Sequence, residues 1–460
     1  MTGPLVVIGG DAAGMSAAAE ARRRDPARPV VVLERSAHVS YSACGLPYWL
    51  GRVVPAREHL VALTPEEARD RRGIDVRTGC AAEWIDPEAR RVGTSDGAVG
   101  YGALIVATGA RPVPPPVPGV DTPGVHLLRS MDSAIALDDA LARHAGGRVL
   151  LVGSGPIGLE MAHNLCRRGF DVHLVEAAPR LVPGFPEEPA ARVEAALEAG
   201  CATARTGHAV VGLAPAGGGV EVRLRAGAAE FAEEYDLVLL GTGVAPRAEL
   251  AAAAGCALGA AGAVRVDRRG RTSVPGVWAA GDCATSWHRV AEREVWTPTA
   301  TVATRAGRVA ARDACAELGG GAATGDDRPP ALLPGVLGSW VSEAFGLGFG
   351  ATGLDDGPAR EAGFAPETVT RTGRDRSGYM PGVEEATVRL VYDGPTGRLL
   401  GGQAVGGHGV ASRLHAIALA VAAGMTVDDL AAVDLAYAPP LSPLRDPLQL
   451  AAGAVVGDAA

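Results

Sequence analysis

Residues 5–14 have the sequence Leu-Val-Val-Ile-Gly-Gly-Asp-Ala-Ala-Gly, an apolar run that leads into a glycine-rich turn. An alanine- and arginine-rich segment continues to about Arg24, and a second apolar run over 30–33 ends at Glu34. The order strand, glycine-rich turn, helix, strand and acid is typical of a βαβ unit that binds a dinucleotide. Its pyrophosphate lies on the helix N-terminus, where free N–H groups and the helix dipole meet it. We therefore predict a dinucleotide site here, although Asp11 replaces the usual middle glycine.

A second copy of this pattern begins near Arg148. Residues 149–158 have the sequence Val-Leu-Leu-Val-Gly-Ser-Gly-Pro-Ile-Gly, and a further apolar run over 172–175 ends at Glu176. Here the glycine fingerprint is complete. Two copies roughly 145 residues apart predict two dinucleotides, normally a tightly held flavin and a visiting nicotinamide.

Three further stretches fit two nucleotide-binding domains. Residues 104–110 and 237–246 are apolar runs that end in Thr-Gly turns, and residues 274–282 place Asp282 at the end of a strand, where such sheets bind ligands. The proline-rich residues 112–118 predict a crossover between domains. We predict an α/β fold with two Rossmann-like domains and a C-terminal α+β dimerisation domain. The boundaries are 1–115 and 248–325 for the two parts of the FAD domain, 116–247 for the NAD(P)H domain and 326–460 for the dimerisation domain.

Composition excludes several classes of function. All 43 basic residues are Arg and the net charge is −9, so neither nucleic-acid binding nor a lysine Schiff base is expected. No apolar run is long enough to span a membrane, and the N-terminus lacks the basic start of a signal peptide. The seven cysteines are scattered and odd in number, which favours a reducing cytoplasm. Neither the cysteines nor the ten histidines have metal-ligand spacing, so we predict no metal.

The segment 40–48, Ser-Tyr-Ser-Ala-Cys-Gly-Leu-Pro-Tyr, carries the candidate redox residue, Cys44. Gly45 permits close backbone approach and Pro47 suits a first helical turn, so Cys44 should lie near a helix N-terminus with a lowered thiol pKa. A lone cysteine is more often an inert core residue, but this setting and the two nucleotide sites favour a reactive one. With no second cysteine nearby, Cys44 would cycle through a mixed disulfide with a small thiol, a persulfide or a sulfenic acid.

The chain resembles the flavin-dependent pyridine nucleotide-disulfide oxidoreductases along essentially its full length. It is most similar to their single-cysteine branch of coenzyme A-disulfide reductases, persulfide reductases and NADH oxidases, through the Cys44 segment and the stretches 377–382 and 436–440. The resemblance implies FAD in the first site, NAD(P)H in the second and possibly coenzyme A (CoA) as a bound thiol. It also implies a homodimer in which Tyr379 and Tyr437 reach the partner's Cys44.

The resemblance further implies which residues bind the cofactors and the substrate. Relatives usually carry Tyr where this chain has Pro156, so we expect an altered nicotinamide gate that opens the flavin to oxygen. Arg72 stands where relatives carry Lys, which phosphate binding tolerates. The CoA groove is implied at Arg23, Ser40 and Arg72. The implied cofactor-binding residues are Gly9, Gly10, Ala13, Gly14, Glu34, Arg35, Ser42, Thr108, Gly109, Arg111, Gly153, Gly155, Pro156, Ile157, Gly158, Glu160, Glu176, Gly243, Gly281 and Asp282.

These features predict hydride transfer from NAD(P)H to FAD, followed by reduction of a small disulfide, persulfide or polysulfide at Cys44. Tyr379 and Tyr437 would hydrogen-bond or protonate the leaving thiolate. Two alternatives stay open at this point: an NADH oxidase that reduces oxygen through a Cys44 sulfenic acid, and a redox-signalling flavoprotein with slow turnover. Glu176 favours NADH over NADPH, while Arg180 could offset part of that preference.

Overall fold

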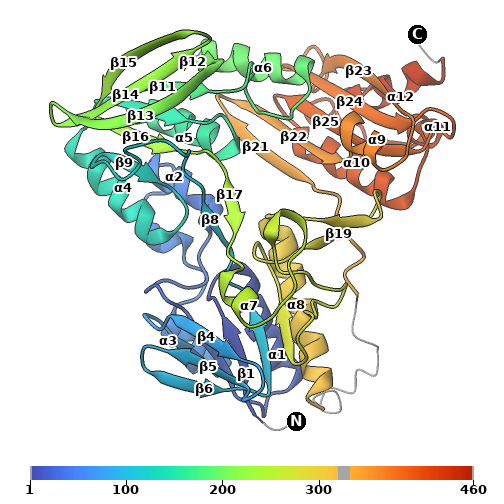
Figure 1. Cartoon of the computed structure of the whole chain (residues 1–460). Helices are drawn as coiled ribbons and strands as arrows, with labels where there is room; N and C mark the ends of the chain where they lie inside the picture. The colour runs from blue at the N-terminus through green and yellow to red at the C-terminus, as the bar shows by residue number, and fades with distance from the viewer. Residues whose placement is uncertain (1–2, 320–331, 458–460) are drawn as a thin grey trace.

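A computed structural model of the chain describes residues 3–319 and 332–457. It contains two five-stranded parallel sheets, one five-stranded antiparallel sheet and several smaller ribbons (Figure 1). The predicted combination of two Rossmann-like units with a C-terminal α+β unit is therefore confirmed. The predicted boundary at 325/326 lies outside the described residues, and the other boundaries stay predictions.

The first parallel sheet has the strand order β18-β7-β1-β2-β3. Its central strand pairs Leu5 with Val30 on one side and with Ala103 on the other. These strands are buried on both faces, which explains their unbroken apolar sequences. Helices α1 and α8 run side by side against the sheet (Figure 1). The bounds are β1 Leu5–Ile8, α1 Ala12–Arg24, β2 Val30–Leu33, β3 Ile74–Arg77, β7 Ala103–Val106, β18 Val277–Ala279 and α8 Ala300–Glu317.

The second parallel sheet has the order β12-β11-β10-β16-β9 and repeats the topology of the first around the second fingerprint. A three-stranded antiparallel ribbon, β13-β14-β15, packs beside it (Figure 1). The bounds are β9 Val125–Leu127, α4 Met131–Arg143, β10 Arg148–Val152, α5 Pro156–Arg167, β11 Asp171–Glu176, α6 Glu187–Glu198, β12 Ala202–Thr206, β13 His208–Ala216, β14 Gly219–Ala226, β15 Ala229–Tyr235 and β16 Leu237–Leu240.

Two chain crossings join the nucleotide-binding units. Strand β8 (Ala110–Pro112) leaves the first unit, β17 (Val244–Pro246) returns to it, and Arg111 pairs antiparallel with Ala245. The predicted crossover at 112–118 therefore begins inside a short strand. Because Val277–Ala279 pairs with β7, residues beyond the second unit complete the first sheet.

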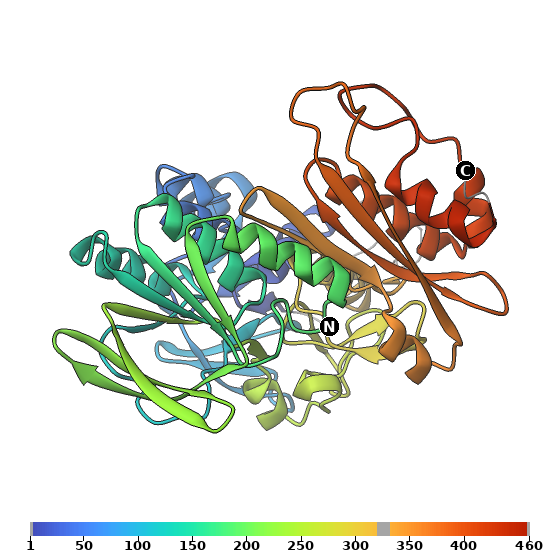
Figure 2. The ribbon, with the colours of Figure 1, turned by 90° about the horizontal axis from the view of Figure 1, so that it is seen from above.

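The third unit is an antiparallel sheet, β21-β22-β25-β24-β23, with helices packed on it (Figures 1 and 2). Residues 386–392 lie within strand β24, and helix α10 ends at Gly424, which caps it with a φ of 73°. The bounds are β21 Trp340–Ala344, β22 Leu347–Gly353, α9 Asp356–Glu361, β23 Pro366–Arg374, β24 Glu385–Asp393, β25 Leu399–Gly406, α10 Val410–Ala423, α11 Val427–Ala432 and α12 Pro447–Val455.

Short elements complete the part of the chain that the structure describes. None of its helices is both long and apolar enough to cross a membrane. The remaining bounds are α2 Leu46–Leu50, α3 Pro65–Arg72, β4 Ala82–Asp86, β5 Arg91–Thr94, β6 Gly97–Gly100, α7 Glu249–Ala253, β19 Ser286–His288 and β20 Arg293–Val295, with 3₁₀ turns at Ala43–Gly45, Arg57–Leu60 and Ala260–Gly262.

Candidate active site

The first glycine-rich turn joins β1 to α1 at the carboxyl edge of the first sheet. Gly9 has a φ of 107°, and a Cβ atom there would overlap the carbonyl oxygen of Ala107. A Cβ atom on Gly14 would overlap the carbonyl oxygen of Gly9. Only glycine fits these two positions, and the tight turn leaves the first N–H groups of α1 free for an anion.

A cavity of about 520 Å³ opens beside this turn. Glu34 is held at its rim, because Oε2 accepts a hydrogen bond from the Gly10 N–H at 2.8 Å and Oε1 accepts one from the Ser36 N–H at 2.8 Å. The buried Nε of Arg247 has no hydrogen-bond partner among the described residues. A carboxylate for ribose and guanidinium groups for phosphate fit the adenosine end of FAD. Five of the predicted cofactor residues line this cavity: Gly9, Glu34, Arg35, Thr108 and Arg111.

Two further acids, Asp11 in the turn and Asp282 after β18, lie close enough to interact electrostatically. Asp282 follows β18 and accepts a hydrogen bond from Arg129 at 2.7 Å, yet burial raises the pKa of Asp282 above its usual range. Burial likewise raises the pKa of Asp11 to about 6, and its Oδ1 has no partner among the described residues. Gly281 adopts a φ of 83° and lies against Ala13. Sequence reasoning missed Arg129, because 153 residues separate it from Asp282 and no local signal marks it.

Cys44 lies in the 3₁₀ turn Ala43–Gly45, directly before the five-residue helix α2. The expected lowering of its thiol pKa is wrong. Cys44 is exposed on one side, but the protein around the sulfur removes enough water to raise the pKa of the thiol, and the Glu160 carboxylate raises it further. Arg129 counteracts this rise in pKa only in part. A helix of one turn has too small a dipole to outweigh these effects.

Glu160 connects the surroundings of Cys44 with the second nucleotide-binding unit and with the third unit. It lies on α5 and accepts a hydrogen bond of 2.6 Å from Ser342 on β21. Burial raises the pKa of Glu160, and nearby Glu343 adds to the rise. Ser342 is a second residue that sequence reasoning missed, since 182 positions separate it from Glu160. The site therefore draws on all three units.

The second glycine-rich turn joins β10 to α5 and is more open than the first. Gly153 has a φ of 100°, and a Cβ on Gly158 would overlap the carbonyl oxygen of Gly153. A Cβ on Gly155, in contrast, would meet nothing within 4 Å. Pro156 and Ile157 begin α5 and are exposed. Gly243, on the loop after β16, also borders open space.

Glu176 ends β11 and is buried at the second turn. Its Oε2 accepts hydrogen bonds from the N–H and the hydroxyl of Ser154 at 2.9 and 2.8 Å, and its Oε1 accepts one from the Ala178 N–H at 2.8 Å. Arg180, which could have offset the charge of Glu176, pairs with Glu187 at 2.7 Å. The structure therefore keeps a carboxylate at the position that reads the ribose of a dinucleotide.

The three residues implied for CoA binding lie at the two ends of helix α1. Ser40 donates its N–H to the carbonyl of Gly10 at 2.8 Å, which places it near the start of the helix. Arg23 lies in its last turn, and Arg72 approaches that end because its carbonyl accepts a hydrogen bond from Arg22 at 3.2 Å. At 1.5 Å per residue the two ends are roughly 18 Å apart. One extended molecule could contact both, whereas a small ligand could not.

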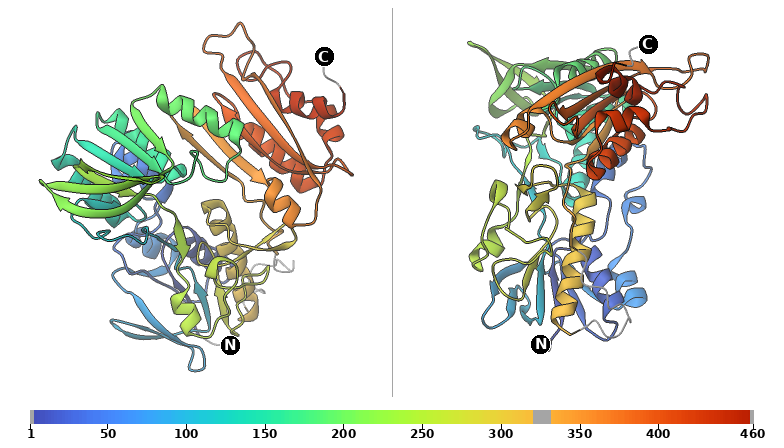
Figure 3. Two further views of the ribbon diagram at one scale, coloured as in Figure 1. Left: turned by 45° about the horizontal axis from the view of Figure 1, so that its top comes forward. Right: turned by 90° about the vertical axis from the view of Figure 1, so that its right-hand side faces the viewer.

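Tyr379 and Tyr437 lie on two loops that project from the third unit (Figure 3). Tyr379 is 74% exposed and Tyr437 is 46% exposed. The Tyr437 hydroxyl lies 3.3 Å from the hydroxyl of Ser377. No hydrogen bond joins either phenol to Cys44 within the described part of one chain. Two other residues implied for FAD binding lie close to other site residues in sequence: Ser42 shortly before Cys44, and Gly109 directly after Thr108.

Comparison with known families decides the relationship. The model of the pyridine nucleotide-disulphide oxidoreductases matches residues 3–307, and the model of their dimerisation domain matches residues 345–446. The chain belongs to the pyridine nucleotide-disulphide oxidoreductase family. It is an NAD(P)H-dependent FAD enzyme, and the dimerisation domain supports a homodimer.

Relatives within this family have several named activities. The chain is 34% identical over 456 residues to the CoA-dependent NAD(P)H sulfur oxidoreductase of Pyrococcus abyssi, covering 96% of each chain. It is 30% identical to the NADH oxidase of Methanocaldococcus jannaschii over 97% of each, and 26% identical to the coenzyme A disulfide reductase of Staphylococcus aureus over 96% of this chain and 97% of that one. The solved structure of an NAD-dependent persulfide reductase from A. fulgidus superposes with a TM-score of 0.91 at 31% identity, covering 99% of this chain and 83% of the other.

Proposed function

We propose that this enzyme uses NADH to reduce CoA disulfide, CoA persulfide or a related small disulfide or polysulfide through FAD and Cys44. The observation that carries the proposal is the position of Cys44. Its sulfur interacts electrostatically with Asp11, Arg129 and Asp282 beside the first nucleotide site. It also interacts with Glu160 beside the second nucleotide site. No second cysteine lies next to Cys44 in the sequence. A lone sulfur at this junction can exchange only with a sulfur that the substrate brings.

Bound FAD supplies the two-electron chemistry that links a nicotinamide to a thiol. We assign Gly9, Gly14 and Glu34 to hold its adenosine diphosphate end. The chain's other contribution is the charge balance at Cys44. Arg129 stabilises a thiolate on the sulfur, while the carboxylates around it favour the thiol. The thiolate therefore forms more readily as the pH rises. It attacks one sulfur of the substrate's S–S bond, which breaks and releases the other half as a thiolate, and a new S–S bond forms on Cys44. The two electrons that NADH supplies then reduce this bond and restore the Cys44 thiolate.

The leaving thiolate needs a proton donor, and we assign that role to the tyrosines of the partner subunit. A hydrogen bond to Ser377, and then one to Tyr379, lowers the pKa of Tyr437, whereas the bond to Tyr437 raises the pKa of Tyr379. Tyr437 is therefore the better proton donor of the two, and Tyr379 supports it by hydrogen bonding.

A group of arginines around the buried Glu20 carboxylate, at the end of α1, supports a substrate as anionic as CoA. Burial lowers the pKa of Arg23, and repulsion from Arg312, Arg24 and Arg308 lowers it further, so several guanidinium groups converge at this end of α1. Together with Arg72 they could bind phosphates, while Ser40, which precedes Cys44 closely in the sequence, lies at the opposite end of α1.

One observation favours a second activity, the reduction of oxygen. Pro156 begins α5 without an aromatic ring to cover the flavin, and both it and Ile157 are exposed. We therefore infer that oxygen also gains access. Two electrons from NADH would reduce it to hydrogen peroxide, and the Cys44 thiolate would attack the peroxide and break its O–O bond, which gives a sulfenic acid on Cys44 and water. We further propose a cytoplasmic location, since the cysteines of the described chain are all free.

The Cys44→Ser variant tests the proposal. NADH should still reduce the flavin in the variant within about twofold of the normal rate, while turnover of CoA disulfide and CoA persulfide should disappear, because a serine hydroxyl hardly ionises near neutral pH. Oxygen consumption with and without CoA disulfide separates the two activities. Mass spectrometry of the intact protein should find a CoA-sized adduct on Cys44. Turnover by Cys44→Ser at the normal rate would overturn the mechanism.

A further inference from the structure

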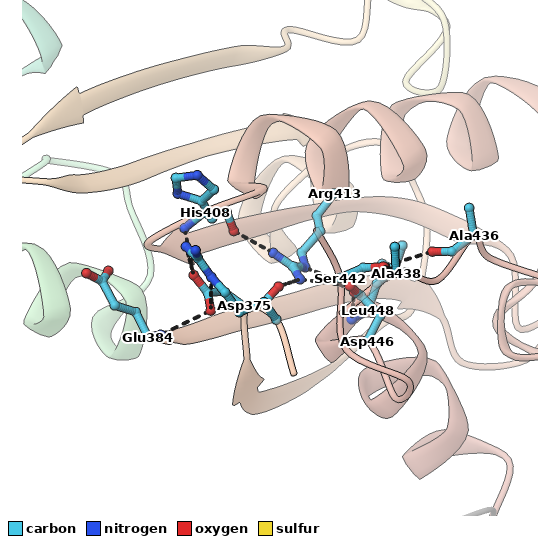
Figure 4. A network of polar contacts seen from close by, with 10 residues as sticks. Asp375, Glu384, His408, Arg413, Ala436, Ala438, Ser442, Asp446 and Leu448 are labelled. Carbon is cyan, nitrogen blue, oxygen red and sulfur yellow. Dashed lines mark hydrogen bonds and ion pairs between the residues drawn. The ribbon is translucent and has the colours of Figure 1, made fainter. Parts of the chain in front are cut away.

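A buried ionic network ties together the bases of the two loops that carry Tyr379 and Tyr437 (Figure 4). Its centre is Arg413 on α10, which is 5% exposed. The guanidinium donates to both oxygens of Asp446, from Nε to Oδ1 at 3.0 Å and from Nη2 to Oδ2 at 2.8 Å. It also donates to the carbonyl of Asp375 at 3.1 Å and to that of His408 at 2.8 Å. One side chain therefore joins the beginning of the first loop to the end of the second.

Asp375 closes the first loop, residues 375–384. Its carboxylate accepts from the Glu384 N–H at 3.0 Å and from the His408 N–H at 3.1 Å, and its own N–H donates to the Glu384 carbonyl at 2.8 Å. Burial opposes ionisation of Asp375, but the hydrogen bonds from Arg376, Glu384 and His408 outweigh it and hold its pKa below the usual range. The carboxylate therefore stays charged and keeps the two ends of the loop together.

Asp446 anchors the second loop, residues 436–446. Besides its pair with Arg413, its Oδ1 caps α12 by accepting the Leu448 N–H at 2.9 Å. Ser442 fastens the loop internally, since its hydroxyl donates to the Ala436 carbonyl at 2.9 Å. The tips meet through the Ser377 N–H, which donates to the Pro439 carbonyl at 3.1 Å, and through the hydroxyls of Ser377 and Tyr437, which lie 3.3 Å apart. The position of both tyrosines therefore depends on the base of the loops.

We propose that Arg413 is a positioning residue that acts through Asp375 and Asp446 to place Tyr379 and Tyr437 for the reaction at the partner's Cys44. This inference rests on the proposed function of the tyrosines. Arginine suits the task because its planar fork reaches a carboxylate and two carbonyls at once, whereas a lysine ammonium is a single point. The network lies outside the nucleotide sites, so it can affect the disulfide step without affecting flavin reduction.

The test compares Arg413→Lys with Arg389→Lys in the FAD-loaded dimer. Arg389 is a matched control: it is also buried in the third unit and bonded to Asp355 at 2.6 Å and Gln403 at 2.9 Å, but it contacts neither tyrosine loop. In Arg413→Lys, flavin reduction by NADH should stay within about twofold, while kcat/KM for CoA disulfide falls roughly 10- to 100-fold, the effect of a small misplacement of a catalytic group. An equal loss in Arg389→Lys would overturn the proposal, because the effect would then be general destabilisation.

Two further measurements complete the test. Adding Tyr437→Phe to Arg413→Lys should cost much less than adding it to the wild type, because the hydroxyl is already misplaced; additive losses would overturn the proposal. Hydrogen exchange of the holo dimer should be faster in both loops and unchanged elsewhere. That readout needs no turnover, so it tests the network even if the wild type reduced no disulfide and the proposed function failed. Asp446→Asn, which keeps an oxygen for the α12 cap, should show the same pattern if Arg413→Lys folds poorly.

Discussion

The two glycine-rich turns bind their acids in the same way but differ in how far the protein encloses them. In each, the acid at the end of the second strand accepts from the second residue of the turn: Glu34 from Gly10 and Glu176 from Ser154. The first helix, α1, is covered by α8 so closely that a Cβ on Gly307 would overlap the carbonyl of Ala13. The second turn borders open space. An enclosed turn suits a nucleotide that stays bound, and an open one suits a nucleotide that must leave.

The largest effect is expected from substitutions that disrupt one glycine-rich turn at a time. Gly14→Val should prevent FAD binding, because its side chain would overlap the carbonyl of Gly9, and should give a colourless protein. Gly158→Val should stay yellow, while NADH reduces its flavin about 10- to 100-fold more slowly. Absorbance spectra and stopped-flow reduction measure both. A Gly158→Val protein that loses its FAD would show that the two turns are not independent.

The next effect concerns the third position of the turn, which is Asp11 in the first copy and Gly155 in the second. The rise in the pKa of Asp11 from 3.8 to about 6 corresponds to roughly 3 kcal/mol. Because the folded protein holds this proton more tightly than the unfolded chain, the stabilisation is present below pH 3.8 and is lost as the pH rises through about 6. Asp11→Asn should therefore stabilise the FAD-free protein at pH 7.5 by up to about 3 kcal/mol and hardly at all at pH 4.

Denaturant unfolding of wild type and Asp11→Asn at the two pH values measures this difference. The comparison needs FAD-free protein, since the phosphates of FAD would change the local charge. An equal stability difference at pH 4 and pH 7.5 would mean that Asp11 does not titrate between them. In that case its unpaired Oδ1 would have a partner in solution.

A smaller effect distinguishes the two acids. Glu176→Gln should raise the kcat/KM ratio of NADPH to NADH tens-fold, because a carboxylate about 4 Å from a 2′-phosphate costs roughly 4 kcal/mol before screening. Gln keeps an oxygen for the Ser154 N–H group and loses the hydrogen bond from Ala178, which bonds to the other carboxylate oxygen. Glu34→Gln, the matched change in the first copy, should leave the ratio unchanged. If the Glu176→Gln ratio stays constant, the carboxylate does not face the ribose.

The smallest effect is expected at Ser154. Its hydroxyl donates to Glu176 and accepts from the Val182 N–H at 3.1 Å, so it holds the acid and the following loop together. Ser154→Gly should shift the NADPH to NADH ratio only a few-fold, the value of about one hydrogen bond. The first copy has no room for this hydroxyl, since a Cβ on Gly10 would lie 2.6 Å from Val39 Cγ1. A shift as large as that of Glu176→Gln would mean that Ser154 controls the acid entirely.

Sequence alone predicted both turns, the strands and helices around them and the acids that end the second strands. These features are local: the apolar runs, the glycines that the turns require and the position of an acid at a strand end are all contained within about 30 residues. The same local reasoning failed for the thiol pKa of Cys44. Proximity to a helix start is a local property, but burial and the charge of Glu160 are not.

The tertiary structure alone decided how the parts of the site act on one another. Arg129 meets Asp282 across 153 residues and Ser342 meets Glu160 across 182, so no sequence spacing could have indicated either pair. Arg413 joins two loops whose motifs were visible in the sequence although their connection was not. The physical reason is that hydrogen bonds and desolvation depend on which surfaces pack together. A linear pattern records only which face of each element is apolar.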